Sequence, residues 1–428
     1  MILFSYILSI NNIKMNKILE NYINKIKHRT KYFDDFNNFC FAPFIKIIIW
    51  ARRVGKSFFV FQTIKKLLEE KKIKKSEIFY INKEWLEFDE IKDYKDLNNF
   101  FENWKEKNNI WNIFFVWIDE IQEIKNWEKF ILSVWSSFPE SIIYITGSNS
   151  KLLSKDIWTN LRWRYISKKI YPLSLSEFSE FKWEKINKKL FWEYINFGWL
   201  PAMPSIESEN IKIDYLKWVY NTIFVKDLIE YENIRNVSLL KNIHKFLFKE
   251  VWNLINSKNI SDYLKKEKIN TSVETILNYI EFSCNSFLID EVNRYDIRGK
   301  KLFEITKKIF SFDLWIRNSL IWIDLKNDIW WIYENIVYNH LVSNWYDVKV
   351  GILWDKEIDF IAEKNNKKIY IQVAYLLSSE KVIDREFWNL MKIKDWWEKI
   401  VISNDELFVD NYEGINHYNI LDWLKNMK

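Results

Sequence analysis

The residues with the clearest chemical potential form one segment that follows an apolar run. The segment matches the phosphate-binding pattern G-x-x-x-x-G-K-[ST] at every fixed position except the first, in the order Trp50-Ala51-Arg52-Arg53-Val54-Gly55-Lys56-Ser57. In such a loop, backbone N–H groups and a helix N-terminus surround the β- and γ-phosphates of a nucleotide. The Lys56 ammonium would neutralise phosphate charge, and the Ser57 hydroxyl would bind Mg²⁺. The segment therefore predicts a site for ATP and Mg²⁺, with a chance Gly-Lys-Ser after a strand as the alternative.

An acidic pair stands where the second half of such a site belongs. The apolar run Ile113–Ile118 is followed directly by Asp119 and Glu120. An acidic pair at the carboxyl end of an apolar strand is typical of the Walker B arrangement. Asp119 would hold Mg²⁺ through water, and Glu120 would orient and deprotonate the attacking water as a catalytic residue. The alternative is a solvated turn.

Two further polar segments are candidates for the same site. Ser148 and Asn149 follow the next predicted strand, Ile142–Thr146, so either side chain could sense the γ-phosphate, with a plain turn as the alternative. Farther on, Arg162 or Arg164 could reach a nucleotide as a catalytic arginine finger, from the same chain or from a second copy. A solvated basic turn is the alternative for both arginines.

The composition has one anomaly, and it bears on position 50. The chain has 24 Trp and only 6 Gly, and the two counts together equal the share of about 7% that glycine has in an average protein. The first position of the phosphate loop needs a residue that can take positive φ without bulk near the phosphates, which glycine provides. An indole at Trp50 would occupy the anion site. Trp163 and Trp199 likewise stand where glycine is expected.

We interpret many of these tryptophans as glycines in the living protein. A gene in which UGA encodes glycine would give this sequence if it were translated with a table that assigns UGA to tryptophan. The pairs Trp330–Trp331 and Trp396–Trp397 fit glycine pairs in turns, and the Ile, Lys and Asn content fits an AT-rich genome. A truly tryptophan-rich protein is the alternative, and Trp127 and Trp423 are candidates for genuine tryptophans. The codon UGG at position 50 would contradict the interpretation there.

Predicted strands and helices alternate around the candidate site. In chain order they are strand Phe44–Ile49, helix Lys56–Glu70, strand Ile78–Ile81, helix Leu97–Lys105, strand Ile113–Ile118, helix Glu128–Trp135 and strand Ile142–Thr146. This alternation predicts an α/β fold with a parallel sheet. Together with the phosphate loop, it indicates a P-loop NTPase of the RecA or AAA type.

These residues resemble a large group of uncharacterised prokaryotic ATP-binding proteins. In that group an AAA-type, archaeal ATPase-like P-loop domain precedes a C-terminal domain of unknown function. The matching segments are Ala51–Ser57, Ile118–Gln122, Thr146–Ser150, Tyr171–Ser174, Gly198–Pro201, Glu334–Val337 and Glu357–Phe360. Trp199 stands where the family pattern has glycine. The resemblance implies an ATPase with a nucleic-acid-related C-terminal half, and it supplies no substrate.

The sequence predicts five regions. An N-terminal helical extension covers 1–40, with residues 16–40 as a helix, and an AAA-type ATPase domain covers 41–172. A helical lid covers 173–250, a winged helix covers 251–310, and a restriction-endonuclease-like α/β domain covers 311–428. Met15 is a candidate for the true start, with Met1 as the alternative.

The predicted winged helix has an unusual charge distribution. Its third helix, Val273–Ile280, carries acidic residues and no Lys or Arg, so we do not expect it to contact bases in the DNA major groove. The predicted wing is the better candidate for DNA phosphates, and its cations are Arg294, Arg298, Lys300 and Lys301. The alternative is a module that packs against the ATPase or a second subunit.

The last region resembles the PD-(D/E)xK nuclease fold. In active members a helix Glu, a strand Asp and an acid-x-Lys on the next strand bind Mg²⁺ and activate water. Glu334 and Asp359 stand at fitting places, but Gln372 and Ala374 replace the acid and the lysine. We therefore predict a degenerate domain that does not cleave DNA, with an active nuclease as the alternative.

Composition limits the remaining possibilities. The net charge of +6 over 428 residues is too dilute to indicate nucleic-acid binding by itself. No run of about 18 apolar residues occurs, which argues against a membrane-spanning helix. Cys40 and Cys284 with four histidines suggest neither a disulfide framework nor a zinc site, and residues 1–10 make a poor signal peptide. We expect a cytoplasmic protein.

These observations predict a Mg²⁺-dependent ATPase whose nucleotide state switches its attached modules. The alternative is a nucleotide-gated DNA-binding or protein-interaction switch with little turnover. The expected partners are ATP, DNA at the wing, and a protein partner or second copy of the chain.

Overall fold

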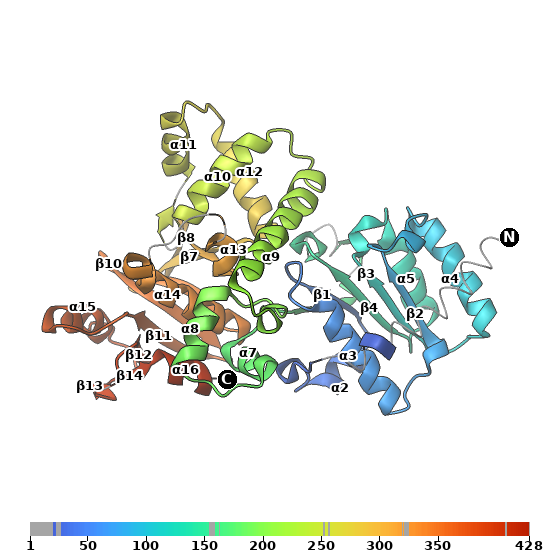
Figure 1. The fold of residues 1–428 in the computed structure, drawn as a ribbon, viewed down its shortest axis with the longest axis horizontal. Helices are drawn as coiled ribbons and strands as arrows, with labels where there is room; N and C mark the ends of the chain where they lie inside the picture. Colours follow the sequence, from blue (N-terminus) through green and yellow to red (C-terminus); the bar gives the residue numbers. More distant parts are fainter. Residues whose placement is uncertain are drawn as a thin grey trace. The chain divides into compact units, whose positions relative to one another are not determined.

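The computed structural model describes residues 20–22, 27–153, 159–161, 163–250, 253–255, 257–318, 320, 325–406 and 409–427. The chain divides into two compact units, Met1–Tyr171 and Pro172–Lys428. In Figure 1 the first unit runs from blue to teal and the second from green to red. Each unit is described by itself.

The first unit is built on a five-stranded sheet with the order β2-β3-β4-β1-β5. Its strands are β1 (Ile45–Ile49), β2 (Ile78–Asn82), β3 (Phe115–Asp119), β4 (Ile142–Gly147) and β5 (Tyr165–Lys169). All four neighbouring pairs are parallel. Every residue of β1 and β3 is buried, as expected for strands covered on both faces. The predicted parallel α/β sheet is confirmed.

Helices lie on both faces of this sheet (Figure 1). The helices and turns of the unit are η1 (Thr30–Tyr32), α2 (Phe36–Phe41), α3 (Lys56–Glu69), η2 (Lys75–Glu77), η3 (Leu86–Phe88), α4 (Tyr94–Asn108), η4 (Ile121–Glu123), α5 (Trp127–Ser137) and η5 (Ser150–Leu153). Phe61 of α3 contacts Tyr80 of β2, with ring centroids 6.0 Å apart. Phe79, the preceding residue of β2, contacts Trp104 of α4 at 5.1 Å. Because successive strand residues face opposite sides, α3 and α4 cover opposite faces.

Of the predicted helix over residues 16–40, the structure describes helix at residues 20–22 and in α2, which begins only at Phe36. From residue 27 to α2 the prediction is wrong, because this segment is irregular or forms the short 3₁₀ helix η1. Arg29 supplies the physical reason, because its guanidinium donates to the backbone carbonyls of Val54 at 3.0 Å and Tyr171 at 2.8 Å. These bonds tie an irregular segment to the phosphate loop and to the end of the unit.

The second unit begins with helices. They are α7 (Leu175–Lys182), α8 (Lys188–Phe197), η6 (Met203–Ser205), α9 (Glu209–Thr222), the π-helix η7 (Ile223–Glu230) and α10 (Val237–Lys249). Ser174 caps α7, since its hydroxyl accepts from the Glu177 N–H while the Glu177 carboxylate accepts from the Ser174 N–H. This reciprocal pair is a capping box, which fixes where the helix starts.

A nine-stranded mixed sheet follows, with the order β13-β14-β12-β11-β10-β9-β7-β8-β6. Its strands are β6 (Leu254–Ile255), β7 (Ile289–Asp296), β8 (Lys301–Ser311), β9 (Asp347–Leu353), β10 (Lys356–Lys364), β11 (Lys367–Val373), β12 (Glu398–Ser403), β13 (Asn411–Tyr412) and β14 (Ile415–Asn419). Parallel pairing of β7 with β9 joins the strands of the predicted winged helix to those of the predicted nuclease-like region. One sheet therefore continues across the boundary predicted between residues 310 and 311.

The remaining helices are α11 (Ser257–Lys266), α12 (Val273–Asn285), α13 (Leu314–Asn318), α14 (Leu325–Ser343), α15 (Glu380–Met391) and α16 (Ile420–Asn426). From α10 to β8 the order is helix, strand, two helices and two strands, which is the order of a winged helix, and this assignment stays a prediction. From α14 to β12 it is helix, three antiparallel strands, helix and a strand parallel to the third. Among the described residues, no helix combines the length and apolarity that crossing a lipid bilayer requires.

Within the part of the chain that the structure describes, four tryptophans adopt a backbone conformation that favours glycine. Trp163, Trp183, Trp345 and Trp354 have φ between 58° and 62°, in the left-handed region that costs a non-glycine residue about 1–2 kcal/mol. Trp183 follows the last residue of α7, and the N–H groups of Trp183 and Glu184 bond back to the carbonyls of Glu180 and Ser179. This is the Schellman arrangement, which glycine usually terminates.

We expect Trp183→Gly to raise the free energy of unfolding by about 1 kcal/mol, because glycine removes the left-handed strain and its own chain entropy offsets part of the gain. Trp183 is 86% exposed, so little packing is lost. The matched control is Trp192→Gly inside α8, which should cost about 0.5 kcal/mol through lower helix propensity. Denaturant unfolding of both variants measures the difference. If both variants lost the same free energy of unfolding, the interpretation of position 183 as glycine would be contradicted.

Candidate nucleotide site

The phosphate loop connects β1 to α3. Gly55 takes the left-handed conformation with φ of 98° immediately before α3 begins at Lys56, and Arg53 also has a positive φ of 69°. Strained backbone of this kind occurs at functional sites. The Lys56 ammonium donates to the carbonyls of Trp50 at 2.8 Å and Ala51 at 3.0 Å. The predicted strand, loop and helix are all present, and the loop closes around a buried ammonium.

Asp119, the last residue of β3, lies against the first turn of α3. The Ser57 hydroxyl donates to Asp119 Oδ2 at 2.7 Å, and the Thr146 hydroxyl donates to the other carboxylate oxygen. Burial, followed by the charge of Glu120, raises the pKa of Asp119 to about 6 although both hydroxyls and Lys56 oppose the shift. Hydroxyl and carboxylate oxygens are ligands that Mg²⁺ prefers, so the donor set fits this ion.

Glu120 has three partners in the described arrangement. Its carboxylate accepts from Gln122 at 2.5 Å and Ser148 at 3.0 Å, and it lies 3.7 Å from Arg52. Burial alone would raise the pKa of Glu120, but Lys56, Arg52 and the two hydrogen bonds lower it below its ordinary value. Its backbone is left-handed, with φ of 55°. Glu120 is therefore a carboxylate whose three partners all meet one oxygen, Oε2.

Arg52 links the phosphate loop to the end of β2. Its Nη1 donates to Glu84 Oε1 at 2.7 Å, while its Nη2 faces Glu120. The Arg52 side chain is 8% exposed and that of Glu84 is 44% exposed. The sequence assigned Arg52 only to the loop and did not single out Glu84, because no local pattern pairs residues 32 positions apart.

The two candidate sensors occupy different surroundings. Ser148 contacts Glu120 directly, as a residue beside Walker B should. Asn149 is buried, with 2% of its surface exposed, and its carbonyl accepts from the Leu152 N–H. Of the pair, Ser148 is therefore the one that the structure brings to the Glu120 carboxylate. Thr146, which the sequence placed only in the strand, contacts Asp119.

Arg164 lies where β1 and β5 begin, whereas the phosphate loop lies where β1 ends. It precedes β5, whose first residue pairs with Ile45 at the start of β1, and its carbonyl accepts from the Ile45 N–H at 2.9 Å. The five residues of β1, at roughly 3.3 Å each, separate it from the loop. A finger role for Arg164 within its own chain is therefore wrong, which leaves a role in trans. Arg162 lies outside the described residues.

The Trp50 indole is packed inside the first unit. It is 2% exposed, its ring centroid lies 4.3 Å from that of Tyr171, and the Lys169 ammonium lies 5.5 Å from the ring. The Trp50 carbonyl is one of the two acceptors that hold Lys56. The residue that carries this bulky ring therefore also helps to position the Lys56 ammonium.

A second cluster of buried charges lies in the other unit. Lys308 of β8 contacts Glu334 of α14 at 2.7 Å and Glu357 of β10 at 2.8 Å. Burial and the charge of Glu334 raise the pKa of Asp359 well above its ordinary value, although Lys308 opposes this. Gln372 accepts from the Asp359 N–H at 3.4 Å. The two predicted acids do come together, and Lys308, which the sequence analysis missed, supplies positive charge from β8.

The predicted wing cations flank the β7–β8 turn. Arg298, Lys300 and Lys301 are exposed, and Arg294 is half-buried. The Arg298 guanidinium lies 5.6 Å from the Trp354 ring. Because β7 pairs with β9 at this end, the hairpin is held in the larger sheet.

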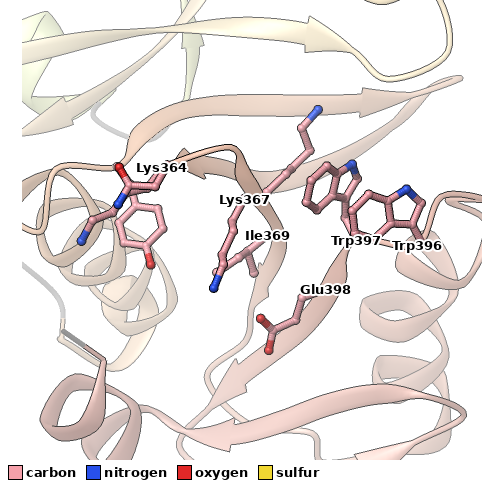
Figure 2. A pocket seen from close by; sticks show the side chains of 9 residues that line it. Lys364, Lys367, Ile369, Trp396, Trp397 and Glu398 are labelled. Atoms are coloured by element: carbon pink, nitrogen blue, oxygen red, sulfur yellow. The ribbon is translucent and has the colours of Figure 1, made fainter.

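A hollow of about 390 Å³ in the second unit is lined by Tyr346, Lys364, Asn365, Lys367, Lys368, Ile369, Trp396, Trp397 and Glu398. Figure 2 shows the indoles of Trp396 and Trp397 side by side on one wall, with ring centroids 4.0 Å apart. This pair is one that we interpret as two glycines. With glycines the wall would be absent, so we assign no ligand to the hollow.

Comparisons with known proteins agree with this picture of the first unit. Residues 43–179 match the model of an AAA domain. The chain is 34% identical over 403 residues to an uncharacterised protein of Haemophilus influenzae, covering 92% of this chain and 98% of that protein. An uncharacterised protein of Methanocaldococcus jannaschii is 32% identical over 390 residues, covering 85% and 83%. The chain belongs to the family of these two proteins. Its first unit is an AAA-type P-loop domain.

A second family model matches part of the second unit. Residues 188–327 match a domain of unknown function, and the names of the two relatives state no activity. Similar solved structures include the Aeropyrum pernix ORC1 protein in complex with DNA, at TM-score 0.34 and 11% identity over 70% of this chain and 94% of that chain. Another is AMPPCP-bound DnaA from Aquifex aeolicus, at TM-score 0.30 and 11% identity over 59% and 86%. Because both TM-scores are below 0.5, neither likeness carries an argument about the function of this chain.

Proposed function

We propose that the protein is a Mg²⁺-dependent ATPase that couples its nucleotide state to the C-terminal region. The observation that carries this proposal is the contact of 2.7 Å between the Ser57 hydroxyl and Asp119, with Lys56 and Glu120 beside it. Two adjacent pairs that are 62 positions apart in the sequence meet as phosphoryl transfer to water requires. The match to an AAA domain supports the same activity.

Each group has a distinct part in the proposed reaction. Lys56 exchanges its two carbonyl acceptors for phosphate oxygens, and Ser57 with Asp119 holds Mg²⁺. When bound, Mg²⁺ would offset the negative charge of the phosphates. Glu120 orients the attacking water and accepts its proton. Because Gln122 and Ser148 both donate to Oε2, the attacking water would be held by Oε1.

The test compares two variants. Lys56→Ala should abolish Mg-ATP binding, because the main cation of the loop is removed. Glu120→Gln should retain binding and lose at least about hundredfold in turnover, since only the base is neutralised. Lys72→Ala, an exposed lysine after α3, is the matched control and should change neither. Equilibrium binding and phosphate release are measured, and unchanged turnover in both site variants would eliminate the proposed site.

The second candidate is a nucleotide-gated switch with little turnover. Glu120 favours it, because Lys56, Arg52 and the two hydrogen bonds to Oε2 lower its pKa against the effect of burial. A carboxylate with a lowered pKa is a weaker base for water. The exposed wing cations, Arg298 and Lys300 among them, are the proposed contact with DNA phosphates. Turnover per site separates the two candidates, and DNA binding through phosphates should weaken steeply as salt is raised. Cleavage of DNA is not proposed, since Gln372 and Ala374 replace the acid and the lysine that it needs.

A further inference from the structure

We propose that Arg52 is the residue that distinguishes ATP from ADP, and that Glu84 holds it beside Glu120 when no γ-phosphate is bound. The inference rests on the proposed function, because it concerns the same nucleotide site. It assigns a specificity role to one residue of the loop and a positioning role to a residue outside both motifs.

The geometry places Arg52 between two carboxylates. One branch of its guanidinium donates to Glu84 at 2.7 Å, which is a full hydrogen bond, and the other lies 3.7 Å from Glu120, which is a looser ion pair. The Arg52 side chain is almost completely buried. A buried guanidinium needs charged or polar partners, so these contacts hold it in one orientation.

A γ-phosphate would compete for the same guanidinium. Glu120 is proposed to orient the water that attacks this phosphate, so a cation beside Glu120 is within side-chain reach of it. Arginine binds phosphate through two parallel hydrogen bonds, which are stronger than one loose ion pair. Arg52 would therefore leave Glu120 for the γ-phosphate of ATP. ADP has no γ-phosphate and would leave the pair with Glu120 in place.

Glu84 sets the balance of this exchange. Its bond to Arg52 stabilises the state without a γ-phosphate, and its own carboxylate is partly exposed. Neutralising Glu84 should therefore release Arg52 toward a γ-phosphate and leave ADP binding unchanged. A residue that only stabilised the fold would change the affinity for both nucleotides alike.

The experiment measures dissociation constants for Mg-ADP and for Mg-AMPPCP, which keeps a γ-phosphate and resists hydrolysis. The full chain is used, both as written and with Trp50→Gly. Arg52→Gln should lower the preference for the triphosphate by about tenfold, and Arg52→Lys should restore part of it. Glu84→Gln should raise the preference about threefold or more. Glu90→Gln, an exposed acid in the same loop, is the matched control and should leave it unchanged.

The outcomes separate this inference from the function on which it rests. If both nucleotides bind but Arg52→Gln leaves their ratio unchanged, the role of Arg52 is overturned and the nucleotide site stands. Parallel losses for both nucleotides would show a structural role and would also overturn the inference. If neither background binds either nucleotide while both remain folded, the proposed function fails and this inference fails with it.

Discussion

Trp50→Gly is expected to increase Mg-ATP affinity by at least about hundredfold over the chain as written. The indole is 2% exposed and packs on Tyr171, while its backbone carbonyl holds Lys56. Glycine at this position would remove the bulk and allow the loop to rearrange around phosphate. Calorimetric titration measures the affinity. Bound Mg-ATP should also raise the unfolding temperature. At a ligand concentration one hundred times the dissociation constant, the free energy of unfolding should rise by about 2.7 kcal/mol.

Two variants make this result specific. Trp50→Phe keeps a buried ring and should bind as poorly as the written chain, whereas Trp50→Gly combined with Lys56→Ala should lose the gained affinity. The glycine variant also loses apolar packing, which costs about 3–5 kcal/mol for a buried tryptophan, so folding is checked in each case. Equal Mg-ATP affinities of the chain with Trp50 and of Trp50→Gly would contradict the argument that the indole hinders phosphate binding. The glycine interpretation would then lose its best physical support.

The parts of the site that the sequence predicted are those set by short-range rules. A strand, a loop and a helix stand in direct succession around Lys56, and the acidic pair follows its own strand. In a parallel sheet the carboxyl ends of the strands meet at one edge, so the contact between Ser57 and Asp119 follows from the predicted elements. Thr146 and Ser148 follow the same logic because they end the neighbouring strand β4.

What the sequence could not supply depends on long side chains and on strand register. Arg52 could meet Glu84 only once the ends of β1 and β2 were placed in one sheet. Arg164 was a reasonable finger until β5 proved to run parallel to β1, which puts the start of that strand far from the loop. The hairpin of β7 and β8 was predicted as a wing, and its pairing with β9 is a non-local contact that no local pattern encodes.

For the glycine interpretation, too, the sequence supplied one part of the argument and the structure supplied the other. Composition alone indicated that too many tryptophans are present, but it could not say which. Backbone conformation sorts some of them, since Trp163 and Trp183 have positive φ. Trp199 gives a different signal, because its indole N–H is buried with no hydrogen-bond partner among the described residues. A buried donor left unbonded costs about 1–3 kcal/mol, which glycine would avoid.

Lys308→Met is expected to lower the free energy of unfolding of the second unit by about 3–5 kcal/mol, the cost of removing one partner from a buried ion pair. Lys308 is 3% exposed and its partner Glu334 is 7% exposed, at 2.7 Å. Without the ammonium, Glu334 and Asp359 would remain buried beside each other. Denaturant unfolding of the full chain measures the loss.

The adjacent residue provides a matched control. Lys307 contacts Glu291 at 2.8 Å, nearly the same distance, but these side chains are 32% and 24% exposed. Water screens such a pair, so Lys307→Met should cost about 1 kcal/mol or less. Combining Lys308→Met with Glu334→Gln should recover part of the loss, because a buried charge is removed together with its partner. Equal losses at positions 307 and 308 would show that Lys308 contributes only surface electrostatics, and that the cluster does not need the positive charge that β8 brings to it.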